Sequence, residues 1–213
     1  MPNPVRQRIF ISGASSGLGE GMARRFAAMG RDLALAARRT DRLQALQKEL
    51  VAAHPDIRVV TSAMDVDDPD SVATVLPELA DRLGGLDRVI VNAGIGKGAS
   101  IGTGKAWANR ATLLTNVLGA HAQCEAAMEL FRTQGAGHLV LISSVASVRG
   151  MRGSRTAYGA SKAALNVLAE GIRSESTARR SGSRRSCPGS SRPISTSAAA
   201  ARSPSGSTRA SRR

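Results

Sequence analysis

Two side chains in the last third of the chain could together move a proton. Tyr158 and Lys162 are four positions apart in a stretch with a helical pattern, so both would lie on one face of a helix. A fixed cation beside a phenol favours phenolate and lowers a pKa that is ordinarily about 10. The pair is therefore a candidate acid/base near neutral pH. The same spacing also fits a half-buried tyrosine beside a solvated lysine, so the interpretation depends on the surrounding motifs.

A glycine-rich segment near the start of the chain could hold a dinucleotide. Residues 11–19 read Ile-Ser-Gly-Ala-Ser-Ser-Gly-Leu-Gly and lie between a strand pattern and a helix pattern. In that context backbone amides and the positive helix end can face a pyrophosphate without side-chain obstruction. The residues predicted to contact the cofactor are Gly13, Ser15, Ser16, Gly17, Leu18 and Gly19. Because the glycine spacing is looser than the usual fingerprint, a tight turn without a ligand is the alternative.

Two arginines, Arg38 and Arg39, follow the second strand pattern. NAD sites commonly place an acidic residue at this point for the ribose hydroxyls, whereas arginine accommodates the 2′-phosphate of NADP. The sequence therefore predicts NADP as cofactor, with NAD as a second possibility. A solvated basic loop is the alternative interpretation of the two arginines.

Short apolar runs alternate with longer amphipathic stretches up to residue 176. Strand patterns cover residues 8–12, 33–37, 57–61, 88–92 and 138–143, and helical patterns cover 19–29, 41–53, 70–83, 105–132 and 158–175. This alternation is typical of a parallel sheet with helices on its faces. It predicts an α/β fold, a Rossmann-type doubly wound parallel sheet, for residues 1–176.

The motifs, taken in order, resemble those of the short-chain dehydrogenase/reductase family over about residues 5–176. The chain has the glycine motif, then Asp65-Val66, then Asn92-Ala93-Gly94, then Asn116, then Ser144, then Tyr158 and Lys162. The resemblance implies an oxidoreductase that transfers a hydride between nicotinamide and a ketone or secondary alcohol. It also implies that Asp65 contacts the adenine and that Val66 beside it is a further cofactor contact. Residues 92–94 would stabilise the sheet and border the adenine ribose.

The resemblance assigns roles to four catalytic candidates. Tyr158 would be the general acid/base, and Ser144 would orient and polarise the substrate carbonyl. Lys162 would bind the nicotinamide ribose and lower the tyrosine pKa, and Asn116 would hold a water for a proton relay. Ser143 is the alternative to Ser144, because the connection to Tyr158 is about one residue longer than in typical members. A homodimer through the helices that contain Asn116 and Tyr158 is also implied.

The composition changes after Ser176. Residues 177–213 hold eleven serines and nine arginines and no acidic residue, and Ile194 is their only large aliphatic side chain. Such a segment buries too little apolar surface to offset its ordering entropy, so we expect disorder and a sheet that is incomplete at its C-terminal edge. Pro188-Gly189 is the one trace of the turn that members of the family place against the nicotinamide, and both residues are predicted cofactor contacts.

A reading-frame change would explain this departure. One allowed codon choice for residues 182–196, read two bases further on, encodes a β-rich run that ends in Pro-Gly-Phe-Ile. That run resembles the sixth strand and Pro-Gly turn of the family. We therefore interpret residues 177–213 as a separate segment and hypothesise that it is a frameshift product.

The remaining composition limits the function classes. The formal charge is +14, but the segment after residue 176 carries +9 of it, so nucleic-acid binding through this tail is the alternative from another class of function.

No apolar run is long enough for a membrane span, and Cys124 and Cys187 have no metal or disulfide spacing. We expect a cytoplasmic protein without a metal. A catalytically impaired dinucleotide-binding remnant is the third interpretation.

Overall fold

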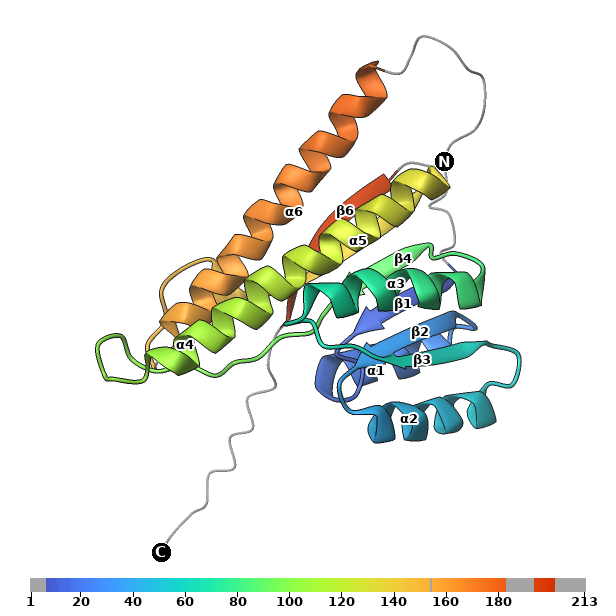
Figure 1. Ribbon diagram of the computed structural model, residues 1–213, viewed down its shortest axis with the longest axis horizontal. Helices are drawn as coiled ribbons and strands as arrows, with labels where there is room; N and C mark the ends of the chain where they lie inside the picture. The colour runs from blue at the N-terminus through green and yellow to red at the C-terminus, as the bar shows by residue number, and fades with distance from the viewer. Residues whose placement is uncertain (1–6, 154, 183–193, 202–213) are drawn as a thin grey trace, which may run out of the picture.

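The computed structural model describes residues 7–153, 155–182 and 194–201. Its strands form one parallel sheet in the order β3-β2-β1-β4-β5-β6 (Figure 1). The strands are β1 (Arg8–Ser12), β2 (Asp32–Ala37), β3 (Val59–Ala63), β4 (Arg88–Val91), β5 (Gly137–Ser144) and β6 (Ile194–Ala201). The strand order reverses between β1 and β4, so the fold is the predicted Rossmann-type doubly wound sheet.

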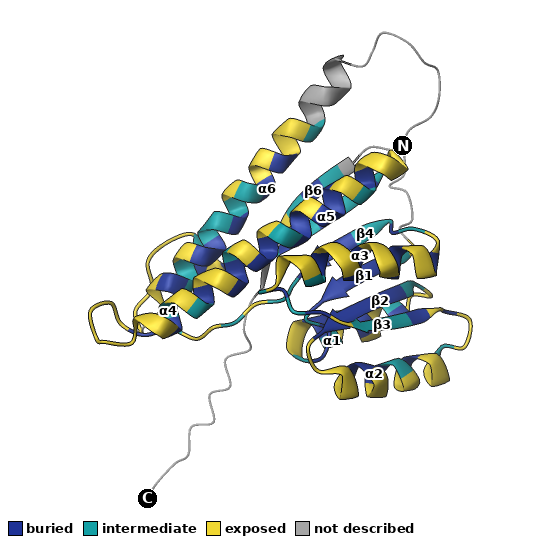
Figure 2. Ribbon diagram, viewed as in Figure 1, coloured by how far each residue is buried: buried dark blue, intermediate teal, exposed yellow. Residues whose placement is uncertain are grey.

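Helices cover both faces of the sheet. They are α1 (Gly17–Ala27), α2 (Thr40–Ala53), α3 (Pro69–Leu83), α4 (Ala106–Leu113), the π-helical turn η1 (Leu114–Leu118), α5 (Gly119–Gln134), the 3-10 turn η2 (Val145–Ser147) and α6 (Thr156–Gly182). One apolar cluster joins the sheet to α3, α5 and α6, and the other joins it to α1 and α2. Figure 2 shows the central strands buried and the outer helix surfaces exposed. None of the described helices is long and apolar enough to cross a bilayer.

The alternation along β1 explains the two clusters. Ile9 and Ile11 belong to the cluster with α1 and α2, whereas Phe10 between them belongs to the opposite cluster. Successive strand side chains point to opposite faces, and a parallel sheet covered on both faces therefore has a nearly continuous apolar strand sequence. All three side chains are essentially inaccessible to solvent.

The helical pattern at residues 105–132 forms three successive elements instead of one regular helix. The π-helical turn η1 separates α4 from α5, and it contains Asn116. The extra residue of a π turn rotates the following residues relative to a regular helix, and such turns are frequent at functional sites. Periodicity alone does not distinguish this turn from the helices around it.

The sixth strand lies at the sheet edge that was expected to be incomplete. β6 pairs in parallel with the whole of β5, from Gly137 opposite Ile194 to Ser144 opposite Ala201. The hydroxyl of Thr196 donates to the Ala169 carbonyl oxygen of α6 at 3.3 Å. An open strand edge offers backbone hydrogen bonds to any extended segment, whatever the size of its side chains.

The structure therefore differs from the expectation of disorder for part of the C-terminal segment. Among the described residues, α6 continues through 177–182 and β6 covers 194–201. Residues 183–193 and 202–213 lie outside the described part of the chain. The division of the chain at residue 176 stays a prediction.

Candidate dinucleotide and catalytic site

A cleft of about 1130 Å³ lies along the carboxyl ends of the strands, where ligands bind in doubly wound sheets. Turns that follow five strands line it, together with the start of α6. The predicted site residues that line the cleft are Gly13, Ser15, Ser16, Gly17, Leu18, Arg38, Arg39, Asp65, Val66, Asn92, Ala93, Gly94, Ser144, Tyr158 and Lys162. Gly19 and Asn116 are absent from this lining, and the predicted contacts Pro188 and Gly189 lie outside the described residues.

The glycine turn leads from β1 into α1 with little side-chain bulk. Gly13 and Gly17 have φ values of 65° and 59°, which are left-handed conformations that favour glycine. Gly19 is needed for a different reason, since a Cβ there would lie 2.5 Å from the Gly13 carbonyl oxygen and 2.7 Å from Nδ2 of Asn92. The N-terminus of α1 therefore lies close to the sheet and borders the cleft, as an anion site at a helix end requires.

Ser12 and Asn92 connect the ends of β1 and β4 beneath the cleft. The Ser12 hydroxyl accepts hydrogen bonds from the backbone amides of Asn92 and Ala93, both at 3.0 Å. The side chain of Asn92 donates to the Ser12 carbonyl oxygen at 2.9 Å. Ser12 is fully buried, so these bonds satisfy groups that water cannot reach. This geometry supports the expected stabilising role of Asn92.

The two arginines after β2 lie at the same end of the cleft as the glycine turn. The Arg39 guanidinium donates to the hydroxyls of Ser15 at 3.2 Å and Ser16 at 2.6 Å. Arg38 lies 3.9 Å from the carboxylate of Asp65. Arg38 and Arg39 are exposed, and both side chains line the cleft, so this end presents two cations to a ligand.

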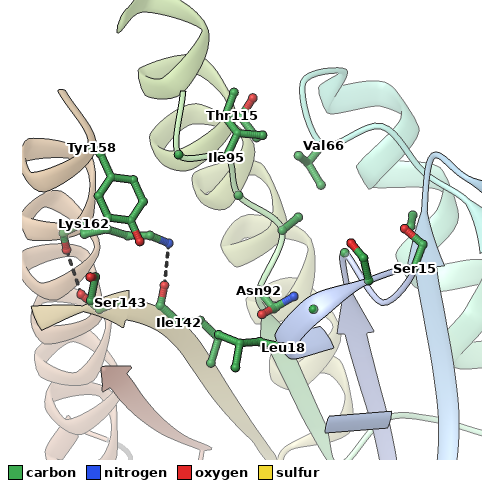
Figure 3. A pocket seen from close by; sticks show the side chains of 18 of the residues that line it. Ser15, Leu18, Val66, Asn92, Ile95, Thr115, Ile142, Ser143, Tyr158 and Lys162 are labelled. Atoms are coloured by element: carbon green, nitrogen blue, oxygen red, sulfur yellow. Dashed lines mark hydrogen bonds between the residues drawn. The ribbon is translucent and has the colours of Figure 1, made fainter. Parts of the chain in front are cut away.

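Tyr158 and Lys162 lie at the opposite end of the cleft, on the first turns of α6 (Figure 3). The ammonium of Lys162 donates to the Ile142 carbonyl oxygen at 2.7 Å and is 6.0 Å from the centre of the Tyr158 ring. Burial lowers the pKa of Lys162 to about 8. Gly94 lies close to the lysine as well as to Asn116, since a Cβ there would be 3.6 Å from Nζ of Lys162 and only 3.0 Å from Oδ1 of Asn116. The lysine is thus held beside the tyrosine by the end of β5.

The two serines that end β5 make different hydrogen bonds. The Ser143 hydroxyl donates to the backbone carbonyl oxygen of Lys162 at 3.1 Å (Figure 3). The Ser144 hydroxyl instead accepts from the amide of Ala146 at 3.2 Å. A hydroxyl has one hydrogen to donate, so the hydrogen of Ser143 is used within the protein. Among the described residues, that of Ser144 has no recorded acceptor.

Asn116 is fully buried behind the cleft, where its side-chain amide joins three segments. Its Oδ1 accepts from the Ile95 amide at 2.8 Å, and its Nδ2 donates to the Ile95 carbonyl oxygen at 2.9 Å. Nδ2 also donates to the hydroxyl of Ser161 at 3.0 Å, and this hydroxyl donates to the Tyr158 carbonyl oxygen at 2.7 Å. Both amide hydrogens are thus used within the protein. The side-chain amide therefore ties η1 to the turn after β4 and to α6, and the role of Asn116 in holding a water stays a prediction.

Three supporting residues were not found from the sequence: Ser12, Thr115 and Ser161. Each has a hydrogen-bonding partner at a distance of 80, 48 and 45 positions respectively, and local patterns contain little signal for such pairs. The one available hint was that Ser161 directly precedes Lys162. No group of three or more histidine, cysteine or acidic side chains suited to a metal ion occurs in the described parts of the chain.

Comparisons with known proteins agree with this architecture. A family model described as short chain dehydrogenase matches residues 7–193. An uncharacterized oxidoreductase of Mycobacterium tuberculosis is 57% identical over 171 residues, which cover 80% of this chain and 68% of that protein. The chain thus spans about two thirds of the length of this relative.

Two solved structures have the same fold and a similar coverage. The crystal structure of levodione reductase is 29% identical with a TM-score of 0.76, and covers 81% of this chain and 67% of that one. An alcohol dehydrogenase from Thermococcus sibiricus, complexed with 5-hydroxy-NADP, is 28% identical with a TM-score of 0.74. That match covers 79% of this chain and 71% of that one.

Proposed function

Because this chain belongs to the short-chain dehydrogenase/reductase family, we propose that it is an NADP-dependent oxidoreductase acting on a ketone or a secondary alcohol. The observation that carries the proposal is one continuous cleft with two chemically distinct ends. One end has the glycine turn and two arginines, and the other has Tyr158 beside Lys162. The cleft residues therefore fit a dinucleotide whose reactive ring lies near the tyrosine.

The chain supplies the proton for the reaction. When bound, the nicotinamide supplies or accepts a hydride at C4. In the reducing direction Tyr158 donates its phenolic proton to the carbonyl oxygen as the carbonyl carbon gains the hydride, and the product is a secondary alcohol. Ser144 is suited to orient that oxygen because its hydroxyl hydrogen has no recorded acceptor among the described residues. Ser143 is less suited, because its hydroxyl already donates to α6.

Lys162 acts at the boundary between the cofactor and the tyrosine. Its pKa of about 8 leaves it mostly protonated at pH 7, so a cation faces this end of the cleft. One of its N–H groups donates to Ile142, and the other two are available to the nicotinamide ribose. Asn116 and Ser161 hold the turn of α6 from which both side chains project.

The test of the acid/base assignment is Tyr158→Phe. The variant keeps the ring and loses the proton, so kcat with NADPH and a responsive carbonyl is expected to fall by about 10²–10⁴-fold. NADPH affinity, measured by fluorescence titration, is expected to change by less than about threefold, because the glycine turn and arginines are untouched. Retention of turnover by the variant would refute the assignment. NADPH binding without turnover by the unaltered protein would favour the impaired remnant.

The NADP preference is supported by the position of Arg38 and Arg39 beside the glycine turn. The cofactors differ only in the 2′-phosphate, and charge-assisted hydrogen bonds from guanidinium to phosphate are strong. The double variant Arg38→Gln, Arg39→Gln is expected to lower NADPH affinity by about 10–100-fold while changing NADH affinity little. Equal losses for the two cofactors would contradict the preference.

We also propose a homodimer through α4, η1, α5 and α6. Large apolar side chains are exposed on these elements, with Trp107 at 67%, Leu118 at 61% and Val167 at 71% exposure. An interface through these helices would remove the three side chains from water, which favours association. Sedimentation velocity at micromolar concentration tests the proposal, and Leu118→Lys is expected to shift the protein toward a monomer. A monomer at all concentrations before substitution would contradict it.

The origin of residues 177–213 is a further proposal that concerns the gene. A shift of frame near codons 176–182 would replace a family-like strand and Pro-Gly turn by the Arg/Ser-rich segment. The match to the mycobacterial relative extends over 171 residues, whereas the chain has 213. Sequencing codons 170–200 decides the matter, because the proposal requires a second frame that encodes a β-rich run through Pro-Gly.

A further inference from the structure

The π-helical turn η1 lies between the two ends of the cleft and contacts elements of both. On one side the turn between β3 and α3, which carries Asp65 and Val66, packs directly against the start of α5. A Cβ on Gly119 would lie 2.6 Å from the Val66 carbonyl oxygen, so the two backbones are in contact. This close contact leaves little room for one segment to move without the other.

Thr115 of η1 adds a hydrogen bond to this contact. Its hydroxyl donates to Oδ2 of Asp67 at 3.1 Å, and both residues line the cleft. The other carboxylate oxygen, Oδ1, is buried and has no hydrogen-bonding partner among the described residues. The amide of Asp67 in turn donates to Oδ1 of Asp65 at 3.1 Å. Among the described residues, the Thr115 hydroxyl is therefore the hydrogen-bond donor to this carboxylate.

The adjacent residue of η1 points to the catalytic helix. Asn116 donates to Ser161, and Ser161 donates to the carbonyl oxygen of Tyr158. Thr115 and Asn116 are almost wholly inaccessible to solvent. Two consecutive residues of one π turn thus link the turn at residues 65–67 with the first turn of α6.

We infer that Thr115 is a positioning residue that couples adenosine binding at residues 65–67 to the placement of Tyr158. The inference rests on the proposed function, since it requires a dinucleotide in the cleft. An adenosine group that orders the turn at residues 65–67 restricts Asp67, and through Thr115 it restricts η1. The Asn116 and Ser161 hydrogen bonds then hold the backbone of Tyr158. A ligand at one end of the cleft consequently orders a helix that it does not contact.

The experiment measures backbone amide exchange by mass spectrometry, with and without saturating adenosine 2′,5′-bisphosphate. This probe has the adenosine and the 2′-phosphate but no nicotinamide, so any effect on residues 156–162 is indirect. The variants are Thr115→Val, which has nearly the same shape without the hydroxyl, and Thr115→Ser, which retains the hydroxyl. Binding is monitored at residues 64–68 in the same spectra.

In the unaltered protein and in Thr115→Ser, the probe is expected to slow exchange at 64–68 and, by at least about fivefold, at 156–162. In Thr115→Val, protection at 64–68 persists at saturation and protection at 156–162 is lost. Remote protection that persists in Thr115→Val overturns the inference, as does probe binding without remote protection in the unaltered protein. If the probe does not protect 64–68 at all, the proposed function fails together with the inference.

Discussion

Replacing Lys162 by methionine tests the electrostatic environment of the site without any assumption about substrate. The lysine is 5% exposed, and burial lowers its pKa from 10.5 to about 8. This difference corresponds to about 3 kcal/mol between the charged and neutral forms. Below pH 8 the lysine is protonated in both the folded and unfolded states, so folding bears the full cost of burying the charge. Above pH 10.5 it is neutral in both states and that cost is absent.

Between these limits the unfolded chain binds the proton more tightly than the folded protein, so stability rises with pH. Relative to Lys162→Met, the unaltered protein is therefore expected to gain about 3 kcal/mol of unfolding free energy between pH 7 and pH 10.5. The variant also loses the hydrogen bond to Ile142, which changes its unfolding free energy by the same amount at every pH. Only the titration of Lys162 makes the difference in unfolding free energy between the two proteins depend on pH. Titrations of groups remote from Lys162 cancel in the comparison.

The assay is urea unfolding followed by circular dichroism at five pH values from 7 to 10.5. Lys48 is exposed on α2, so Lys48→Met provides the matched curve for removing a solvated lysine. For each variant, the quantity compared is its difference from the unaltered protein in unfolding free energy. If this difference changes with pH no more steeply for Lys162→Met than for Lys48→Met, the reasoning is refuted. A dependence of opposite sign refutes it as well, since it would require burial to favour the charged lysine.

Three further predictions concern other parts of the structure. Gly19→Ala would place a Cβ 2.5 Å from the Gly13 carbonyl oxygen and so displace the glycine turn. NADPH affinity is expected to fall at least about tenfold, and an unchanged affinity in a fluorescence titration would show that the turn has room for a side chain. Ser12→Ala leaves two part-buried backbone amides without the hydroxyl that accepts from them. Urea unfolding is therefore expected to show a loss of about 1–3 kcal/mol, and a loss below about 0.5 kcal/mol would contradict this account. Burial raises the pKa of the Cys124 thiol to about 12, so a Cys187→Ser variant is expected to react with a disulfide reagent at pH 8 only after denaturation.

The sequence was sufficient for the first five strands of the sheet and for most of the cleft, for a physical reason. The strands of the first five units are short apolar runs, and each of the predicted turns follows one of them directly. In a parallel sheet the carboxyl ends of the strands share one edge, so motifs that follow strands must converge there. Residues as distant as Gly13 and Ser144 could thus be assigned to one edge of the sheet, whereas the place of Tyr158 in the same cleft was implied by the family resemblance.

The sixth strand shows where compositional reasoning was insufficient. The prediction of disorder counted apolar side chains, and the run of serine, threonine and alanine in β6 has almost none of the large ones. Its pairing instead depends on backbone hydrogen bonds to the free edge of β5. Whether an unpaired strand edge is available depends on the assembled sheet, and the composition of a segment does not show this.

The sequence by itself determined the fold class through its periodicity. The order of its motifs implied the family and many of the residues that border the cleft. Only the tertiary structure decided how those residues are held. Three of these arrangements depend on side chains that meet across different elements. They are the different hydrogen bonds of Ser143 and Ser144, the bonds from Asn116 to Ile95, and the bond from Thr115 to Asp67. Such contacts depend on the packing angle and register of whole helices and strands, which local sequence does not specify.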